Sequence, residues 1–504
     1  MTKPAELYAC LYAKEFPAQA ILRLRPEQRS QPCVVLDGEP PQQTVCALNA
    51  PARALGAEPG MTRVEVDTLP ALQIHARSRK DEAAARVVLL ECAGAFSPRV
   101  EDRSTDNAFI CVVDIAGTEK LFGAPDRLAA TFYSRVRALG ITAVIAVSGN
   151  LHAALCLAKG LSLRTPIRVI PPGAEQSELS SVPLSVLDLA ESHAETFSLW
   201  GIHNLGMLAS LPEIELVARM GQEGSRLRQL ARGTLPHLFQ PVEPAFTLEE
   251  RMELDNPVEL LASLLFVTGV MLDQLILRAA ARVLALASVT VTLLLEGGGT
   301  HSRTVRPALP TNDRLLWLKL LHLDLEAHPP PAAILALALT AQPGVTGKIQ
   351  LGLFSPQVPD PGRLDVTLAR IAKIVGEDCV GRAVLRDTHH PEGFRLERFI
   401  VPAGEPAELP AVPVHAVLRG LRPPEDVRVT VAGRRPERLQ FRQQLYTVER
   451  AYGPWLAGGE WWNAGAWGHE QWDLIARSAT GSTLSCCLIR DPSRNQWQVV
   501  GLYD

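Results

Sequence analysis

The sequence has little of what marks metal-binding, secreted or membrane proteins. Its nine cysteines stand singly except for Cys486 and Cys487, and none forms a CxxC pair of the kind used for zinc or redox chemistry. It has no uninterrupted apolar run long enough to span a bilayer. The start, MTKPAELYACLYAKEF, lacks the long apolar core of a signal peptide. We therefore expect a protein of the reducing cytoplasm, without a metal ion or other cofactor.

An excess of charge of one sign is also missing, because 50 basic and 54 acidic side chains leave a net charge of -4. This balance neither requires nor excludes a nucleic-acid partner, but it argues against a protein that holds DNA by bulk charge alone. What is abundant is apolar: hydrophobic residues make up 47% of 504. That length predicts about three or four domains, each with its own core.

The first third of the chain alternates predicted strands with predicted helices. This pattern implies an α/β or α+β body. The predicted strands are residues 6–13, PCVVLDG, QTVCALNA, a segment near Arg99, residues 108–115 and TAVIAVSG, and the predicted helices are residues 16–24, 80–95 and 126–139.

Residues 246–340 show a second periodic pattern. After an initial strand, the sequence predicts a helix over 257–282, strands over 286–295 and 302–308, a helix over 312–327 and a strand over 332–340. The order is βαββαβ.

The five residues QLGLF, from Gln350 to Phe354, follow this pattern and are enclosed by glycines and prolines. A short extended segment with a polar first residue and the apolar anchors Leu351, Leu353 and Phe354 suits capture in a groove of a partner. The alternative is a buried strand end of the preceding domain.

Several segments together resemble the palm and fingers of Y-family translesion DNA polymerases. These segments are the first strand with its FPA helix, LNAPARALGAEPGM, VVDIAGTEKLFG and AVSGNLHAALCLAKG. LWGIHNLGML resembles the helix-hairpin-helix turn of that family's thumb, in which Gly201 and Gly206 would give tight turns and let backbone amides approach phosphate. The βαββαβ segment would be the little finger.

The resemblance implies an α+β multidomain fold that ends in a mostly β region. The expected parts are palm and fingers over 1–165, a helical thumb over 166–240, a little finger over 243–342, a linker with QLGLF over 343–362, and a C-terminal partner-binding region over 363–504.

The metal ligands of that family are missing. Such polymerases hold two magnesium ions with carboxylates on two strands, because phosphoryl transfer needs cations that bridge the reacting oxygens. Aligned on FPA and on VVDIAG, the ligand positions are Tyr12, Lys14, Phe109 and Ile110. A lysine repels magnesium, and Phe and Ile offer no oxygen.

Neighbouring carboxylates do not replace them, since strand alternation points Glu15 and Asp114 to the other face. The nucleotide pocket is also altered, with Ala50 where a tyrosine is expected and Pro17 where a bulky residue screens the sugar. Arg53 is retained, either as a phosphate ligand or as a surface or packing arginine.

The expected little finger is not basic. Residues 243–355 hold 11 acidic and 8 basic side chains. Since phosphate neutralisation supplies most of the affinity for duplex DNA, we expect binding to damaged or primer-template DNA to be weak.

A polymerase-like body without metal ligands resembles the ImuB subfamily of bacterial mutagenesis cassettes. QLGLF then matches the QLxLF pattern by which bacterial polymerases dock on the sliding clamp, with Gln350 in a polar site and Leu351, Leu353 and Phe354 as anchors. The resemblance implies two further partners, an ImuA-type RecA-like protein and an error-prone C-family DNA polymerase.

The C-terminal region holds alternating runs that predict a small antiparallel β domain. Before it, residues 363–375 predict an amphipathic helix whose apolar face suits a partner or, in our interpretation, a core. His389 and His390 have no nearby cysteine and do not indicate a metal site. Five tryptophans are candidate partner-binding residues, unless they cap the core of the β domain: Trp455, Trp461, Trp462, Trp467 and Trp472.

The sequence therefore predicts a non-catalytic adaptor of a translesion mutasome in the SOS response to DNA damage. The alternative from the enzyme class is an active translesion polymerase with a rearranged metal site. A third hypothesis is a DNA-binding module for lesions or primer ends.

Overall fold

The computed structural model describes residues 6–243, 246–345, 361–387, 393–397, 399, 417–459, 462 and 467–503. The chain divides into two compact units, Met1–Arg370 and Ile371–Asp504. QLGLF lies outside the described residues, as do His389, His390 and Trp461.

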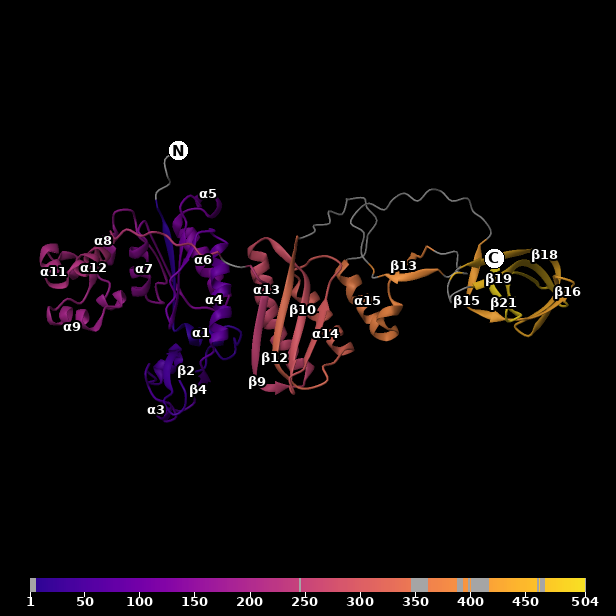
Figure 1. Ribbon diagram of the computed structural model, residues 1–504, viewed down its shortest axis with the longest axis horizontal. Coiled ribbons are helices and arrows are strands. Elements are labelled where there is room, and N and C mark those ends of the chain that lie inside the picture. The colour runs from indigo at the N-terminus through magenta and orange to yellow at the C-terminus, as the bar shows by residue number, and fades with distance from the viewer. Residues whose placement is uncertain are drawn as a thin grey trace. The chain divides into compact units, whose positions relative to one another are not determined.

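A five-stranded sheet with the order β5-β6-β1-β7-β8 forms the centre of the N-terminal region (Figure 1). The middle strand β1 (Tyr8–Lys14) is antiparallel to β6 (Ala108–Asp114) and β7 (Val144–Ser148), and β5 (Val100–Asp102) and β8 (Ile167–Val169) are the edges. Both faces are covered, which explains the almost unbroken apolar sequence of β1.

The two faces of this sheet pack against different helices. One face packs against α1 (Phe16–Leu22), α4 (Arg79–Gly94) and α6 (Pro125–Ala138). The other packs against α7 (Leu151–Gly160) and a helical group. That group consists of α8 (Glu175–Leu179), α9 (Glu191–Leu199), α10 (Leu205–Ser210), α11 (Glu213–Met220) and α12 (Gln222–Arg232).

A smaller sheet, β3-β2-β4, forms a separate lobe below the first. The predicted strand pair is confirmed as β2 (Cys33–Asp37) and β3 (Thr44–Leu48), with β4 (Gln73–Ala76) parallel to β2. The short helices α2 (Ala50–Ala54) and α3 (Arg63–Val66) cover it, while α5 (Glu119–Phe122) precedes α6.

The predicted βαββαβ order is confirmed in the sheet β11-β10-β12-β9, which is antiparallel throughout. We call this the second sheet, and the five-stranded sheet around β1 the first sheet. Its core contains the fully buried Trp317, whose indole Nε1 donates to the Thr311 carbonyl at 3.0 Å. The elements are β9 (Glu249–Val258), α13 (Leu261–Ala281), β10 (Leu284–Leu295), β11 (Thr300–Val305), α14 (Arg314–Ala327) and β12 (Ile334–Val345).

Helix α13 is the one described helix that is long and apolar enough to cross a membrane by length and composition. Half of its apolar window is buried inside the protein, and its inner face packs against β10 and β12. Its composition is that of a core helix.

The C-terminal unit contains a seven-stranded antiparallel sheet, as the alternating runs predicted. Its order is β15-β21-β20-β19-β18-β17-β16, and Leu439, Trp472 and Leu488 lie in its core. The strands are β15 (Leu418–Asp426), β16 (Arg428–Ala432), β17 (Arg435–Phe441), β18 (Gln444–Gly459), β19 (Trp467–Ser478), β20 (Thr483–Asp491) and β21 (Gln496–Tyr503). A two-stranded sheet of β13 (Arg382–Leu385) and β14 (Phe394–Glu397) precedes it.

The predicted amphipathic helix is found as α15 (Pro361–Val375), but its assignment to a core is wrong. Leu364 and Leu368 are only half-buried, and Ile371, Ile374 and Val375 are exposed.

Candidate functional site

The four positions that would hold metal ligands lie on the adjacent strands β1 and β6. Tyr12 stands directly opposite Ile110, and Lys14 stands two residues further along β1. Phe109 is fully buried on the face of α1 and α4, where its ring lies 5.5 Å from that of Phe16. The strands therefore bring Tyr12, Lys14 and Ile110 to one face of the sheet and leave Phe109 on the other, so the expected ligand positions hold apolar side chains, a phenol and an exposed ammonium.

Tyr12 is half-buried, and desolvation together with the carboxylates of Asp188 and Glu15 raises the pKa of its phenol. It is therefore a neutral phenol at physiological pH, not an anionic oxygen ligand. Beside it, Lys159 of α7 forms an ion pair with Asp188, so this lysine is already neutralised by a carboxylate of the chain.

Glu15 directly follows β1 in a left-handed conformation, with φ of 56°. One oxygen of its carboxylate accepts from the Leu48 amide at 3.1 Å, and the other accepts from Arg53 Nη2 at 2.6 Å. The arginine that the sequence left open as a phosphate ligand thus has an internal carboxylate partner. Asp114 lies at the far end of β6 and pairs with Arg99 at 3.2 Å.

The remaining pocket positions offer no replacement ligand. Pro17 is buried in α1, and Ala50 opens α2. In the described part of the chain, no group of three or more His, Cys, Asp and Glu side chains gathers closely enough to hold a metal ion.

The helix-hairpin-helix expectation needs a correction at Gly206. This residue lies inside α10, not in the turn, and a Cβ there would come within 2.8 Å of the Ser180 carbonyl. Its amide donates to that carbonyl at 3.0 Å, and the Leu205 amide donates to Val182 at 2.9 Å. Gly206 therefore serves close packing, and its amide is not available to phosphate in this conformation.

Gly201 does lie in the turn between α9 and α10, with φ of 69°. Its amide donates to Ser198 at 3.0 Å. The Asn204 side chain caps α10 by accepting from the Met207 amide at 2.9 Å. The turn has the expected shape, but its first amides are used within the protein.

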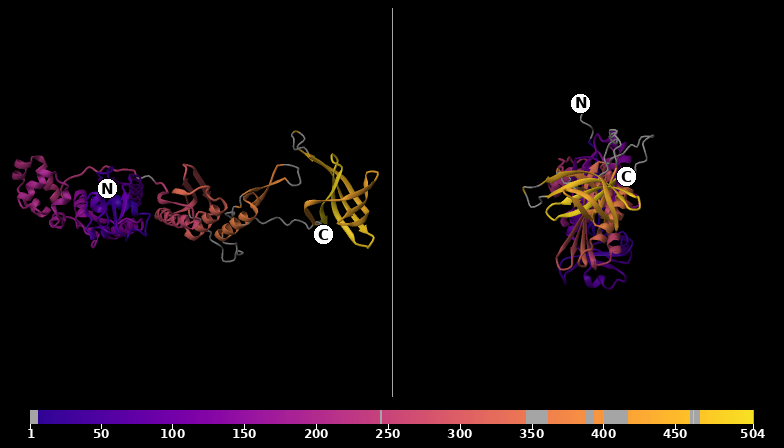
Figure 2. Two further views of the ribbon diagram at one scale, coloured as in Figure 1. Left: turned by 90° about the horizontal axis from the view of Figure 1, so that it is seen from below. Right: turned by 90° about the vertical axis from the view of Figure 1, so that its right-hand side faces the viewer.

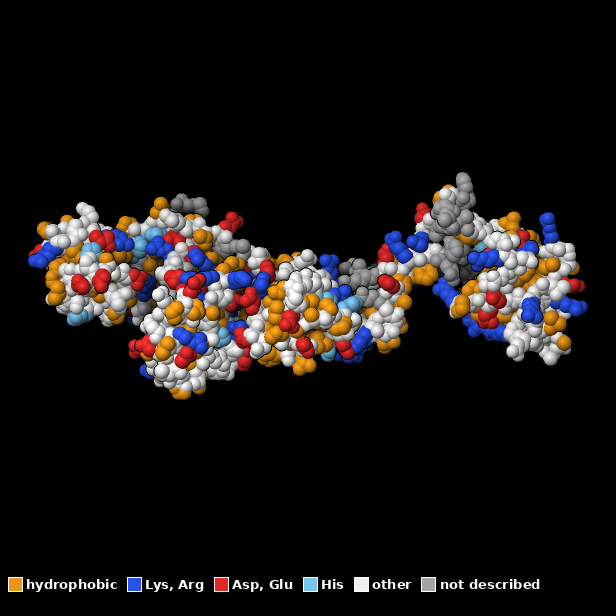
Figure 3. Space-filling model, turned by 60° about the horizontal axis from the view of Figure 1, so that its bottom comes forward, with side chains coloured by type: hydrophobic (Ala, Val, Ile, Leu, Met, Phe, Trp, Pro, Cys, Tyr) orange, Lys and Arg blue, Asp and Glu red, His pale blue; other side chains and the backbone are white. Residues whose placement is uncertain are grey.

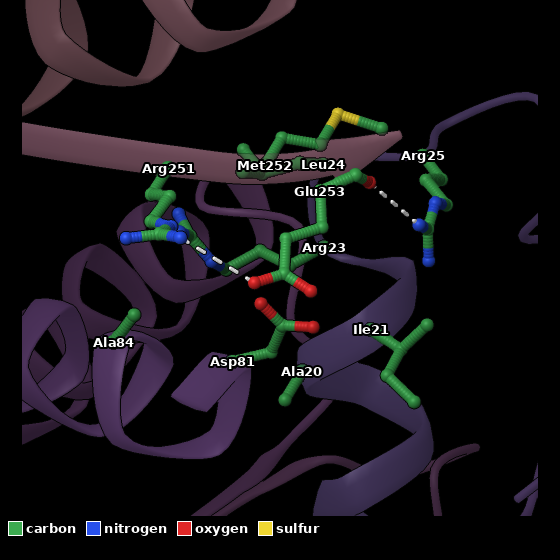
Figure 4. Close-up of a pocket in the computed structure, with 10 residues that line it drawn as sticks. All are labelled: Ala20, Ile21, Arg23, Leu24, Arg25, Asp81, Ala84, Arg251, Met252 and Glu253. Carbon is green, nitrogen blue, oxygen red and sulfur yellow. Dashed lines mark hydrogen bonds and ion pairs between the residues drawn. The ribbon is translucent and has the colours of Figure 1, made fainter. Parts of the chain in front are cut away.

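A small pocket lies where the segment after α1 meets β9 and the start of α4 (Figure 4). Arg25 Nη2 donates to the Glu253 carbonyl at 3.2 Å, and Arg251 pairs with the Glu253 carboxylate at 3.5 Å. Asp81 points toward the same carboxylate from α4.

Next to this pocket, four buried charged side chains join the second sheet to the helices of the first. We call them the charge tetrad: Arg23, Glu250, Arg278 and Glu91. Glu250 accepts from Arg23 Nη1 at 3.2 Å and from Arg278 Nη1 at 2.9 Å, and Arg278 Nη2 donates to Glu91 at 2.5 Å. Each side chain is at most 3% exposed, so the pairing is complete within the protein.

The segment between α12 and β9 is also held against the first sheet. Its His237 ring nitrogen and Gln240 amide contact the buried Glu101 carboxylate of β5 at 2.9 and 2.8 Å. Val242 forms a β-bridge with Val100, and the Phe239 ring stacks on Tyr8 at 5.9 Å. Local sequence patterns do not indicate this strap, because it depends on contacts between residues far apart in the chain.

The predicted tryptophan cluster is not one surface. Trp472 is 3% exposed and lies in the core of the C-terminal sheet, so its assignment to partner binding is wrong. Trp455 and Trp462 are exposed, and Trp467 is half-buried and stacks on His469 at 5.3 Å.

The charge on the visible face of the N-terminal unit is mixed. Figure 3 shows acidic and basic side chains interspersed over the first sheet and the helical group. A mixed surface of this kind is compatible with weak binding to DNA, since a strong site needs clustered cations.

Comparison with known proteins shows which families this chain resembles. Residues 11–159 match the model of the impB/mucB/samB family. Protein ImuB of Caulobacter vibrioides is 25% identical over 399 residues, which cover 76% of this chain and 83% of that protein. DNA polymerase IV of Moorella thermoacetica is 30% identical over 249 residues, 46% of this chain and 58% of the relative.

Among solved structures, DinB from Sulfolobus solfataricus aligns with a TM-score of 0.40 and 16% identity, and covers 68% of this chain and 100% of DinB. Residues 11–159 thus match the impB/mucB/samB family, and the chain is similar to Protein ImuB over 76% of its length.

Proposed function

We propose that this protein is a non-catalytic adaptor of a translesion mutasome in the bacterial cytoplasm. It docks on the sliding clamp and recruits an error-prone C-family DNA polymerase and an ImuA-type RecA-like partner after DNA damage. The observation that carries the proposal is which side chains stand at the expected metal-ligand positions: Phe109 and Ile110 are core residues, and Tyr12 stands opposite Ile110 on the neighbouring strand.

The chemistry supports a non-catalytic role. Phosphoryl transfer by two metal ions needs several carboxylate oxygens at one point. On β1 and β6 that point holds a phenol whose pKa is raised by burial and by Asp188 and Glu15. Arg53 is paired with Glu15, and Lys159 is paired with Asp188. A nucleoside triphosphate would have to displace these internal carboxylates to reach either cation.

The clamp contact is predicted from sequence, in the segment Gln350–Phe354 that follows the second sheet. A clamp contact in the middle of the chain and a partner contact at its C-terminal unit would hold the active polymerase near the clamp. Affinity then comes from effective concentration more than from either contact alone.

The first experiment measures binding of the full chain to its own sliding clamp. The variant Gln350→Ala, Leu353→Ala, Phe354→Ala should lose binding by roughly a hundredfold or more, because it removes the anchors. The matched control, Gln357→Ala with Val358→Ala in the same linker, should bind as the wild type does. Equal binding by all three proteins would make QLGLF part of a core.

Primer extension with magnesium on the same wild-type preparation tests the catalytic part of the proposal. We expect no nucleotide incorporation. The similarity to DNA polymerase IV favours the rival, an active translesion polymerase, and magnesium-dependent incorporation that survives further purification would establish it. Salt-sensitive DNA affinity that is independent of the clamp would instead support a DNA-binding module.

A further inference from the structure

A cavity of about 140 Å³ lies beside the charge tetrad, between α4, the end of α6 and the end of α13. Helix α13 covers one face of the second sheet (Figure 2). All three helices contribute apolar lining, through Val88, Leu139 and Leu277. We call this space the junction cavity. An engineered cavity of about 150 Å³ in another protein binds benzene, so the junction cavity fits a compact apolar body of that size.

Two arginines also line the junction cavity, and each has a buried nitrogen without an acceptor. These nitrogens are Nη1 of Arg135, from α6, and Nε of Arg282, which directly follows α13. Among the described residues, neither side chain pairs with a carboxylate. Buried donors of native proteins are almost always satisfied, so two unsatisfied donors at one cavity indicate a ligand that accepts from them.

Aromatic rings hold both guanidinium groups in place. The Cζ of Arg135 lies 4.7 Å from the centroid of the Phe96 ring, and the Cζ of Arg282 lies 4.5 Å from that of the Phe246 ring. A cation–π contact positions a charge without supplying a counter-charge, so the N–H donors still need an acceptor. The two cations are therefore fixed but not neutralised.

The charge tetrad does not neutralise them either, because its two arginines and two glutamates balance one another. Glu91 is the one acidic side chain among the described residues that line the cavity, and it already accepts from Arg278 at 2.5 Å. Cations beside a mostly apolar lining suit an anion with an apolar body. A carboxylate matches guanidinium donors and carries one charge, whereas a phosphate carries more charge and needs more donors.

We propose that the junction cavity binds a small monocarboxylate with a compact apolar body, such as an aromatic or branched-chain acid, whose carboxylate accepts from Arg135 and Arg282. Such a ligand contacts α4 and α6 beside the first sheet and α13 of the second sheet, so its binding stabilises their junction. This inference does not depend on the adaptor function.

The test titrates the full chain with benzoate and, in parallel, with benzyl alcohol, a neutral molecule of similar size, by ligand-detected NMR. Benzoate should bind with a Kd on the order of 1 mM, and benzyl alcohol at least about tenfold more weakly, because charge-assisted hydrogen bonds are the stronger ones. At a benzoate concentration of about ten times the Kd, hydrogen exchange in α4 and α13 should slow about tenfold.

Variants distinguish the arginines from the apolar lining. Arg135→Gln and Arg282→Gln should each weaken benzoate binding by about tenfold or more, while retained binding of benzyl alcohol shows that the cavity is intact. The matched control Arg137→Gln, at an arginine of α6 over the Tyr133 ring and outside the lining, should bind benzoate as the wild type does. Ala95→Leu fills the cavity without changing charge and should abolish binding of both molecules.

Four results would overturn the proposal. The first is the absence of saturable benzoate binding by the wild type. Equal affinity for benzoate and benzyl alcohol would leave an apolar cavity without an anion site. Benzoate binding that survives Ala95→Leu would place the ligand elsewhere on the protein. Inorganic phosphate that displaces benzoate at an equal concentration would show that charge alone is recognised, and would rule out a site selective for carboxylates.

Discussion

The charge tetrad makes a quantitative prediction about how the second sheet is held. Glu250 lies between Arg23 and Arg278, so the substitution Glu250→Gln keeps the shape of the side chain but leaves two guanidinium groups facing each other in a buried site. Arg278 keeps Glu91, which offsets part of the imbalance.

The expected cost can be estimated from burial. Removal of one partner from a buried ion pair typically destabilises by about 3–5 kcal/mol, because the remaining charge cannot be hydrated. A cost of about 4 kcal/mol shifts the equilibrium between the docked and separated sheets roughly a thousandfold. By contrast, the surface pair Arg63–Asp67, with side chains 46% and 53% exposed, should contribute less than about 0.5 kcal/mol.

Hydrogen exchange resolved by peptide is the suitable assay, since a chain of several folded bodies does not unfold in one step. In Glu250→Gln we expect amide exchange in α4, β9 and α13 to accelerate by about two to three orders of magnitude. The acceleration is smaller for amides that already exchange through local opening in the wild type. The control Asp67→Asn should leave the exchange of these elements unchanged.

Two results would refute this explanation. Wild-type protection in Glu250→Gln would show that the tetrad does not hold the junction. A variant with all four side chains replaced by apolar ones, at Arg23, Glu91, Glu250 and Arg278, should recover protection, because well-packed apolar residues often equal a buried ion pair. If it opens as readily as Glu250→Gln, the loss comes from packing and not from unpaired charge.

Three further predictions concern stability. Burial lowers the pKa of His152 from 6.5 to about 4, and His237, Arg103 and Arg226 act in the same direction while Glu101 opposes them. The neutral imidazole therefore stabilises the fold above pH 6.5, and this contribution, up to about 3 kcal/mol, is lost as the pH falls toward 4. The substitution His152→Phe should flatten that part of a stability-versus-pH curve. Trp472→Ala should destabilise the C-terminal unit by about 3–5 kcal/mol in urea unfolding, and Trp455→Ala by less than about 1. Gly206→Ala should cost about 1–3 kcal/mol because of the Ser180 carbonyl, and Gly201→Ala, where the space is open but φ is positive, about 1–2.

A loss of stability between pH 6.5 and 4 that is equally large in His152→Phe and in the wild type would contradict the first of these predictions. The second fails if the two tryptophan variants unfold at the same urea concentration. The third fails if Gly206→Ala is as stable as the wild type.

The sequence predicted the elements with strong periodicity and missed the contacts between them. The βαββαβ order of the second sheet followed from local pattern, because each strand and helix buries one face of its own. Gly206 was assigned to a turn from its place in a motif, whereas the structure uses its missing Cβ to pack α10 against Ser180.

The charge tetrad could have been suspected from the sequence. Glu91 and Arg278 each interrupt the apolar face of a helix, beside Val88 in α4 and Leu275 in α13. A charge on such a face indicates a buried partner, but its identity depends on tertiary contacts that local patterns do not encode.

The apolar side chains at the expected metal-ligand positions also determine how easily single substitutions could create a metal site there. Phe109 and Ile110 are at most 2% exposed, so a carboxylate introduced at either position alone would be an unpaired charge in the core. It would also remove a packed side chain, and only several carboxylates together with a bound cation could compensate. Under the proposed non-catalytic function, a gain of polymerase activity would therefore pass through unstable intermediates, which selection acting one substitution at a time does not favour.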